Sequence, residues 1–162
     1  MKLKDNPLIT DLVGEKTTKL DSRVIFFGNC DELSCHIMNV RTMIDDQNLK
    51  DELEIIVKTL SLIMGKIAGS KNKLLAEHLE QVLSLVSKYK VNFTNFILPG
   101  QTSIACSIHI TRCVARRAEL AYAKVYAEHH TSDIIFEYLN KLSTLFYGIA
   151  QMYEGENGPK KI

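Results

Sequence analysis

Two arginines and a glutamate recur at helical spacing in the second half of this chain. Arg112, Arg116 and Glu119 are separated by four and three positions, so a helix would carry all three on one face. Arg117 adds a further positive charge nearby. A guanidinium can donate two parallel hydrogen bonds to phosphate oxygens, so this stripe is a candidate nucleotide site. A solvated helix face or an interhelical ion pair would produce the same stripe, and the pattern alone favours that alternative.

A polar pair in an apolar segment and an aromatic residue beside a turn are further candidates. Asn140 and Ser143 interrupt an apolar helical pattern, and a buried amide is costly unless it is paired. A cap or an interhelical hydrogen bond would satisfy them as well as a ligand, and is slightly favoured. Phe96 precedes the turn signal Leu98-Pro99-Gly100. It is either core beneath a loop, the commoner case, or an apolar lid over a flat cofactor.

Acidic residues and cysteines complete the reactive side chains. Asp31 and Glu32 suit the positive end of a helix, and Asp31 is also available to pair with an arginine from elsewhere. The four cysteines fit neither a disulfide scaffold nor a CxxC zinc pattern. Cys106 and Cys113 are about two helical turns apart and could hold a metal with a histidine, but burial in a helix interface is favoured. No metal site is therefore predicted.

Length and composition indicate one helical domain over residues 1–162. The chain is 46% hydrophobic and 24% charged, with few Gly or Pro, as is typical of a folded, helix-rich protein. Its 20 Lys plus Arg nearly balance 19 Asp plus Glu, so no global field favours nucleic acid or an anionic membrane. No segment resembles a signal peptide or a membrane span of about 20 apolar residues. We expect a cytoplasmic protein that binds neither nucleic acid nor membrane.

Apolar residues at spacings of three and four predict the helices that position these side chains. Five helices are expected, at about residues 31–46, 49–68, 72–89, 102–128 and from 133 onward. Gly28-Asn29 is expected to form a turn before the first helix. Residues 1–23 should form an irregular arm, and residues 154–162 a frayed polar tail. The predicted fold is an all-α, five-helix up-and-down bundle of the ferritin-like kind.

The fourth predicted helix has two faces. Its polar face carries His109 with Arg112, Arg116 and Glu119. Its apolar face should pack inside the bundle and comprises Cys106, Ile110, Val114, Ala118, Ala121 and Val125. Helical bundles hold metals, cofactors or protein partners alike, so the fold does not define a function.

Three stretches of the sequence resemble the PduO-type ATP:cob(I)alamin adenosyltransferase family. Residues 14–24 and 28–33 are similar to the family's GERxSKDDxRV and GxxDEL. Residues 96–100 and 109–119 are similar to FxLPGG and HxxRxxxRRAE, and residues 138–143 to YLNRLSD. The matches follow the family's order and spacing, so chance is a poor explanation.

The resemblance implies a five-helix bundle that forms a homotrimer, with active sites between subunits. In the family, the Co(I) of a reduced corrinoid such as cobalamin attacks the 5′ carbon of ATP, supplied with Mg²⁺, and triphosphate leaves. A reductase that delivers the electron is a possible partner. The enzyme first removes the lower axial ligand of the corrinoid, so that the cobalt becomes easier to reduce.

The family's site residues map onto matching positions of this chain. Lys19, Arg116 and Asn140 would contact the nucleotide. Glu119 would orient a neighbouring arginine or contact the nucleotide itself. Cationic side chains are suited to a triphosphate that gains charge as it departs.

The remaining roles implied by the resemblance concern the subunit interface and the corrinoid. Arg112 would form an intersubunit ion pair with Asp31, and these two complete the catalytic set with Arg116. Phe96 would lie against the lower face of the corrin, where an apolar ring offers cobalt no replacement ligand.

The N-terminal arm departs from the family. Residues 10–14 resemble the end of the family's TxTGDxGTTxLxGG, but residues 4–9 lack its glycines, and Pro7 cannot donate an amide. Losing two hydrogen bonds of about 1.5–3 kcal/mol each would weaken ATP binding roughly a hundredfold or more. Smaller departures are Gln101, Lys141 and Thr144.

Two functions follow from this sequence. The first is an active adenosyltransferase with a modified arm, favoured by the retained nucleotide residues. The alternative is a catalytically impaired member of the family that serves as a corrinoid-binding carrier, sensor or assembly subunit, favoured by the altered arm. An unrelated helical bundle is the remaining interpretation.

Overall fold

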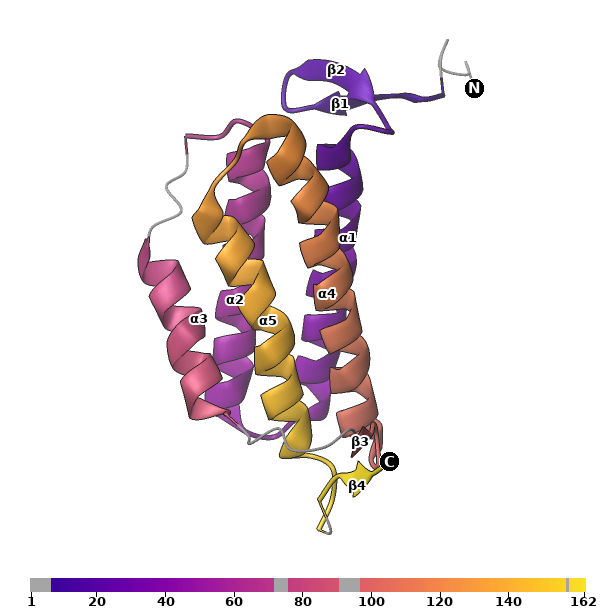
Figure 1. Cartoon of the computed structure of the whole chain (residues 1–162), viewed down its shortest axis with the longest axis vertical. Coiled ribbons are helices and arrows are strands. Elements are labelled where there is room, and N and C mark those ends of the chain that lie inside the picture. The colour runs from indigo at the N-terminus through magenta and orange to yellow at the C-terminus, as the bar shows by residue number, and fades with distance from the viewer. Residues whose placement is uncertain (1–6, 72–75, 91–96, 157) are drawn as a thin grey trace.

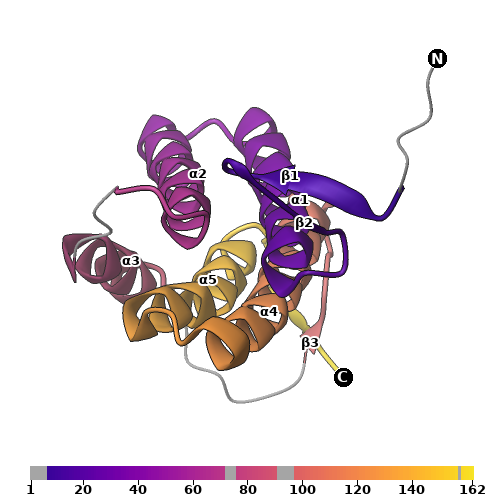
Figure 2. The ribbon, with the colours of Figure 1, turned by 90° about the horizontal axis from the view of Figure 1, so that it is seen from above.

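Five helices run alternately up and down in the computed structural model, which describes residues 7–71, 76–90, 97–156 and 158–162 (Figure 1). They are α1 (Ser22–Met43), α2 (Gln47–Ile67), α3 (Ala76–Lys88), α4 (Ser103–His129) and α5 (Asp133–Gln151). Helix α4 packs against α1 and α5, while α2 packs on α1 and α3 on α5. Viewed from above, α5 lies between α3 and α4 (Figure 2). The predicted all-α bundle is confirmed.

The core of the bundle consists of aliphatic and aromatic side chains from these helices. Phe26, Leu33, Leu60, Tyr122 and Phe146 have no measurable exposure. The hydroxyl group of Tyr122 donates a hydrogen bond to the Ser132 carbonyl oxygen at 3.0 Å and lies 2.8 Å from the Thr131 hydroxyl oxygen. A buried tyrosine therefore fixes the connection between α4 and α5 from inside the core.

Helix α1 starts at Ser22, which makes the predicted start at residue 31 and the predicted turn at Gly28-Asn29 wrong. The carboxylate of Asp21 caps this earlier start by accepting a hydrogen bond from Arg23 N at 2.9 Å. Phe26 and Cys30 extend the buried stripe of the helix backwards at a spacing of four. Burial of that stripe outweighs the local turn preference of Gly28-Asn29.

Other helix boundaries agree with the sequence within a few residues. Helix α2 ends at Ile67, and Gly69 follows with a φ of +93°, as expected of a glycine stop. Thr102 caps α4 through a hydrogen bond from Ala105 N. The predicted start of α3 at residue 72 lies outside the described residues. None of the helices described here is long and apolar enough to span a membrane.

Residues 9–18 of the N-terminal arm form a regular hairpin, contrary to the irregular arm that was predicted. Strand β1 (Ile9–Leu12) pairs antiparallel with β2 (Glu15–Thr18) and forms a hairpin at one end of the bundle (Figure 1). Its turn contains Val13 at φ 39° and Gly14 at φ 86°. Positive φ at both central residues of a two-residue turn lets the two short strands pair directly.

The C-terminal tail is not frayed over the residues described. Strand β4 (Lys160–Lys161) pairs antiparallel with β3 (Ile97–Leu98), and the side chain of Glu154 is buried. This strand pair lies at the end of the bundle opposite the N-terminal hairpin (Figure 1). Polar composition predicted fraying because the long-range contacts of the tail are not visible in the local sequence.

The buried face of α4 agrees with the predicted one only in part: Val114, Ala118 and Val125 are buried as expected. Cys106 is exposed and Ile110 is 47% exposed, whereas Ile108, Ala115 and Tyr122 are fully buried. His109, assigned to the polar face, is buried as well. The buried sector is rotated from the predicted stripe because α4 contacts α1 on one side and α5 on the other.

Candidate functional site

Glu119 and Asn140 meet on the surface between α4 and α5. Asn140 donates a hydrogen bond from Nδ2 to Glu119 Oε1 at 2.8 Å. Asn140 is exposed and Glu119 is partly buried. The interhelical hydrogen bond that the sequence allowed for Asn140 is thus present, and the amide oxygen of the side chain remains accessible to another donor.

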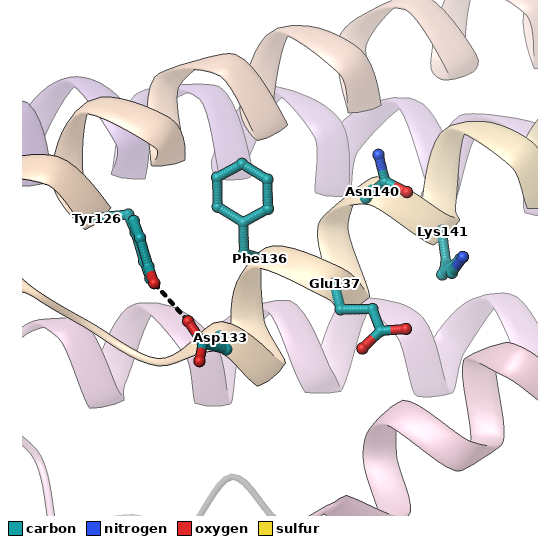
Figure 3. Close-up of a pocket in the computed structure, with 6 residues that line it drawn as sticks. All are labelled: Tyr126, Asp133, Phe136, Glu137, Asn140 and Lys141. Carbon is teal, nitrogen blue, oxygen red and sulfur yellow. Dashed lines mark hydrogen bonds between the residues drawn. The ribbon is translucent and has the colours of Figure 1, made fainter.

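A cavity of about 450 Å³ lies beside Asn140, at the end of the bundle where α4 leads into α5. Figure 3 shows its lining, in which the Tyr126 hydroxyl donates a hydrogen bond to Asp133 Oδ1. The rings of Tyr126 and Phe136 pack edge to face, with centroids 5.6 Å apart. The carboxylates of Asp133 and Glu137 in the lining of the cavity disfavour binding of a triphosphate. The aromatic rings suit an uncharged ring system.

A second cavity, of about 360 Å³, lies between α1 and α4. Arg112 is part of its lining, and the Nε of this residue is buried without a hydrogen-bond partner among the described residues. The Nη2 group of its guanidinium donates to Cys113 Sγ at 3.6 Å. A buried N–H group without a partner is costly, so this arginine is poised for an acceptor from a ligand or another subunit.

Asp31 does not supply that acceptor within the chain. It is exposed on α1, and the described residues contain no ion pair between Asp31 and Arg112. The neighbouring positions do pair, because Arg117 Nη2 contacts Glu32 Oε2. The structure therefore brings α1 and α4 together through Glu32 and leaves Asp31 facing outward.

Arg116 and Lys19 remain available for an anion. Both side chains are exposed, and neither takes part in an ion pair within the part of the chain described here. Arg116 lies on α4 between Arg112 and Glu119, while Lys19 directly follows β2 of the hairpin. The structure does not bring Lys19 into contact with Arg116, although both carry a positive charge that no carboxylate neutralises.

An ion-pair cluster that the sequence analysis missed fixes the hairpin to α1. Arg23 donates from Nε and Nη2 to the two carboxylate oxygens of Asp21, at 3.0 and 2.7 Å, and reaches Glu15 Oε1 at 3.0 Å. Thr17 Oγ1 donates to Asp21 Oδ2 at 2.8 Å. These bonds, led by that from the Arg23 side chain, hold the pKa of Asp21 far below its usual range. The adjacent Lys19 is therefore attached to a fixed segment.

A buried pair of His109 and Glu154 was also missed. His109 Nε2 lies 2.7 Å from Glu154 Oε1, and both side chains are almost fully buried. Only the position of His109 within the HxxR pattern could have drawn attention to it, since Glu154 belongs to a tail with no periodicity.

The remaining candidates from the sequence are Phe96 and the cysteines. Phe96 lies outside the described residues. Cys106 and Cys113 are exposed, so their predicted burial in a helix interface is wrong for this chain. Among the described residues no cluster of three His, Cys, Asp or Glu side chains could hold a metal ion.

The protein is a helical bundle in which α4 carries Arg112 and Arg116, whose guanidinium groups suit a polyphosphate. The Asn140 side chain lies on the neighbouring helix α5 and is held by Glu119. The chain belongs to the cobalamin adenosyltransferase family, because the family's model matches residues 9–153. That match extends from the first strand of the hairpin to just past the end of α5, so of the altered residues 4–9 only Ile9 lies within it.

Individual relatives agree with this assignment. The corrinoid adenosyltransferase of Bacillus subtilis is 29% identical over 160 residues, covering 92% of this chain and 83% of that protein. A cobalamin adenosyltransferase of Cupriavidus metallidurans is 29% identical over 150 residues, covering 90% and 82%. The corrinoid adenosyltransferase PduO of Salmonella typhimurium is 24% identical over 153 residues, and the chain spans 46% of its length.

Solved structures share the fold. A variant of the PduO-type ATP:corrinoid adenosyltransferase of Lactobacillus reuteri, complexed with cobalamin and ATP, superposes with a TM-score of 0.86 at 24% identity. That superposition covers 96% of this chain and 94% of the other. A second variant of the same enzyme, also complexed with cobalamin and ATP, gives 0.85 at 25% identity.

Proposed function

We propose that this protein transfers the 5′-deoxyadenosyl group of ATP to the Co(I) centre of a reduced corrinoid and releases triphosphate. The observation that carries the proposal is the family match over residues 9–153. The arginines of α4 support it, since Arg116 has no carboxylate partner within the described chain and Arg112 has a buried N–H group without an acceptor.

The reaction needs positive charge where the triphosphate leaves. The C5′–O bond of ATP breaks and a Co–C bond forms with the electron pair of Co(I), so the bonding electrons of the C–O bond depart with triphosphate. Arg116 and Lys19 neutralise this growing charge, and Mg²⁺ accompanies ATP as part of the substrate. Asn140, held by Glu119, binds the nucleotide beside α5.

A homotrimer completes the site. Asp31 faces outward on α1, and Arg112 presents a buried N–H group without an acceptor from its own described residues. An ion pair between Arg112 of one subunit and Asp31 of the next would satisfy both. This arrangement places each active site between two subunits.

The corrinoid side of the site rests on Phe96. By the family resemblance, the ring of Phe96 would lie against the lower face of the corrin, where it would exclude the axial ligand and ease reduction of the cobalt. A reductase then supplies the electron in the cytoplasm. Phe96→Ala should slow turnover of the corrinoid and shift the spectrum of the bound cobalt while changing the melting temperature little.

A carrier or sensor is the second candidate, because Pro7 and the lost glycines alter the arm that should wrap the phosphates. One assay separates the two. Chemically reduced cobalamin is incubated with the protein, Mg²⁺ and ATP at up to millimolar concentration, and loss of Co(I) absorbance is followed. Turnover supports the transferase. Corrinoid binding without turnover at saturating ATP supports the carrier.

A further inference from the structure

The segment that follows α5 is fastened to the residues that precede α4. Thr102 Oγ1 donates a hydrogen bond to the Tyr153 carbonyl oxygen at 2.6 Å, and accepts one from Ala105 N at 3.0 Å within the first turn of α4. Strand β4 adds a second attachment by pairing with β3. The C-terminal segment therefore holds residues 97–102 from two points.

Glu154 is the centre of this attachment. Its carboxylate accepts hydrogen bonds from Gly100 N at 3.2 Å and Gln101 N at 2.8 Å, and it lies 2.7 Å from His109 Nε2. The side chain has no exposed surface. A buried carboxylate is costly unless its oxygens are hydrogen-bonded, so these three contacts make the position specific for an acidic residue.

His109 depends on the same carboxylate. Its Nδ1 is buried without a hydrogen-bond partner among the described residues, so Glu154 supplies its recorded polar contact. Loss of Glu154 would leave both ring nitrogens of a buried imidazole unpaired. The pair therefore couples the first turns of α4 to the loop that precedes them.

The loop has little freedom to adopt another shape. Gly100 has a φ of +84°, and a Cβ atom at this position would lie 2.9 Å from Cys106 Cβ. The backbone therefore passes close to α4 in a left-handed conformation that a side chain would strain. With the amides of Gly100 and Gln101 directed at Glu154, the path of Pro99 and Leu98 is set from both sides.

This loop borders the cavity that contains Arg112. Pro99 and His109 belong to the lining of the same 360 Å³ cavity between α1 and α4. Phe96 directly precedes Ile97 in the sequence, and Ile97 is held by β4. The hairpin that carries Lys19 lies at the other end of the bundle (Figure 1). A change in the loop should therefore affect the corrinoid side of the reaction more than the nucleotide side.

We propose that Glu154, acting through Gly100, Gln101 and His109, is a positioning residue that sets the loop through which the protein binds its corrinoid. The proposal rests on the proposed function, since it assigns a side of that reaction to the loop. Glu154 does not touch substrate in this role. It fixes the backbone of residues 100 and 101. This backbone continues from Pro99, which lines the cavity, and Phe96 lies three residues earlier in the sequence.

The test compares Glu154→Ala and Glu154→Gln with Tyr89→Phe. The control removes a hydrogen bond of similar length, 2.6 Å from Tyr89 Oη to Glu52 Oε2, between the α3 end and α2. Glu154→Ala should raise the KM for cob(I)alamin about tenfold or more while the KM for ATP stays within about twofold. Glu154→Gln should recover part of the loss, because its amide oxygen still accepts one backbone hydrogen bond. Tyr89→Phe should leave both KM values unchanged.

Other outcomes decide against the proposal. Equal increases in both KM values would mean that Glu154 only stabilises the fold. The same conclusion would follow from an unchanged KM for the corrinoid together with faster hydrogen exchange at residues 100–101. If Glu154→Ala does not fold, the same comparison is made with Glu154→Gln.

Binding separates this proposal from the enzymatic function. A parent protein that binds cob(II)alamin without turnover rejects the transferase, and the ratio of cob(II)alamin affinities of parent and variant then decides the role of Glu154. A ratio near one overturns the positioning role, and so does a parent that binds no corrinoid.

Discussion

Asn140 and Glu119 join α5 to α4 through a hydrogen bond of 2.8 Å between Nδ2 and Oε1. The bond lies at the surface, so its contribution to folding is modest, about 0.5–1.5 kcal/mol. Its more specific effect is on orientation, because it fixes which edge of the Asn140 amide faces outward. A nucleotide that accepts from or donates to this amide meets a side chain already held in place.

Asn140→Ala should therefore weaken ATP binding more than it destabilises the fold. The accessible amide oxygen accepts from an uncharged N–H or O–H group of the nucleotide, and such a hydrogen bond is worth about 0.5–1.5 kcal/mol, which corresponds to a rise in the KM for ATP of about twofold to tenfold. Ser143→Ala is the control, since Ser143 donates only to the Asn140 carbonyl oxygen in the same turn. Equal losses in the two variants, or a lowered melting temperature that accounts for the loss, would contradict a nucleotide contact.

Two glycines in helices give opposite predictions for stability. A Cβ atom at Gly148 on α5 would lie 2.1 Å from the Tyr89 carbonyl oxygen, so Gly148→Ala should cost at least about 1–3 kcal/mol of unfolding free energy. A Cβ atom at Gly28 on α1 would meet open space, so Gly28→Ala should be neutral or stabilise by up to about 1 kcal/mol. Urea unfolding measures the change in unfolding free energy for both variants, and the Gly148 variant tests the packing of α5 against Tyr89. A stabilising effect at Gly28 would also support the helix at a site where the sequence predicted a turn.

Acid should loosen the C-terminal attachment through Glu154. Burial alone would raise the pKa of this carboxyl, but hydrogen bonds from Gln101 N, Gly100 N and His109 outweigh burial and lower the pKa below 4.5. A depressed folded-state pKa gives stability that is present above about pH 4.5 and is lost as the pH falls through the folded value. The unfolding free energy of the parent should fall in that acidic window. Glu154→Gln, which does not titrate, should show a shallower fall; identical slopes would rule out this contribution.

Helical periodicity was sufficient to predict most of the bundle. The stripe that includes Leu53, Leu60 and Ile63 in α2 lies in the core, and α5 begins and packs as expected. Periodicity failed at α1, where Phe26 and Cys30 are buried on a helix that Gly28-Asn29 was expected to interrupt. Local propensity is a weak signal there, because tertiary burial of the stripe decides the conformation.

Candidate site residues could be named from the sequence only where they lie within motifs that carry the resemblance. Glu119 and Asn140 belong to two such motifs, and the hydrogen bond that joins them was not predicted. His109 and Glu154 are 45 positions apart. No local sequence pattern predicts that a carboxylate in the tail binds a loop so distant in the sequence. Arg112 and Asp31 do not pair inside the chain, so their relationship depends on a subunit arrangement that a single chain does not contain.

The subunit arrangement has a direct test in Asp31→Ala. If Asp31 accepts the Arg112 N–H groups across an interface, removing it leaves a buried arginine charge unpaired, at a cost of about 3–5 kcal/mol. Light scattering should then show a trimer for the parent and a shift toward monomer for Asp31→Ala. Glu137→Ala, which removes an exposed carboxylate on α5, should keep the mass of the parent. A parent that is a stable monomer would exclude the intersubunit pair.

Arg116 is the residue whose loss should most affect chemistry and least affect folding. Its guanidinium is exposed and has no ion-pair partner among the described residues, so Arg116→Ala breaks no ion pair within them. The charge on the leaving triphosphate grows only as the C5′–O bond breaks. A group that stabilises this charge lowers the barrier without being needed for substrate binding.

Arg116→Ala should therefore lower kcat about a hundredfold or more while the melting temperature stays close to that of the parent. Arg116→Lys keeps the charge but loses the paired N–H geometry, so it should recover only part of the rate. Lys124→Ala is the control, because it removes one positive charge from an exposed position on the same helix, where Lys124 pairs weakly with Glu128 at 3.8 Å. Loss of Co(I) absorbance at saturating ATP measures all three. Equal rates for parent and Arg116→Ala would remove Arg116 from the reaction, and equal losses in Arg116→Ala and Lys124→Ala would reduce its role to the general charge of the surface.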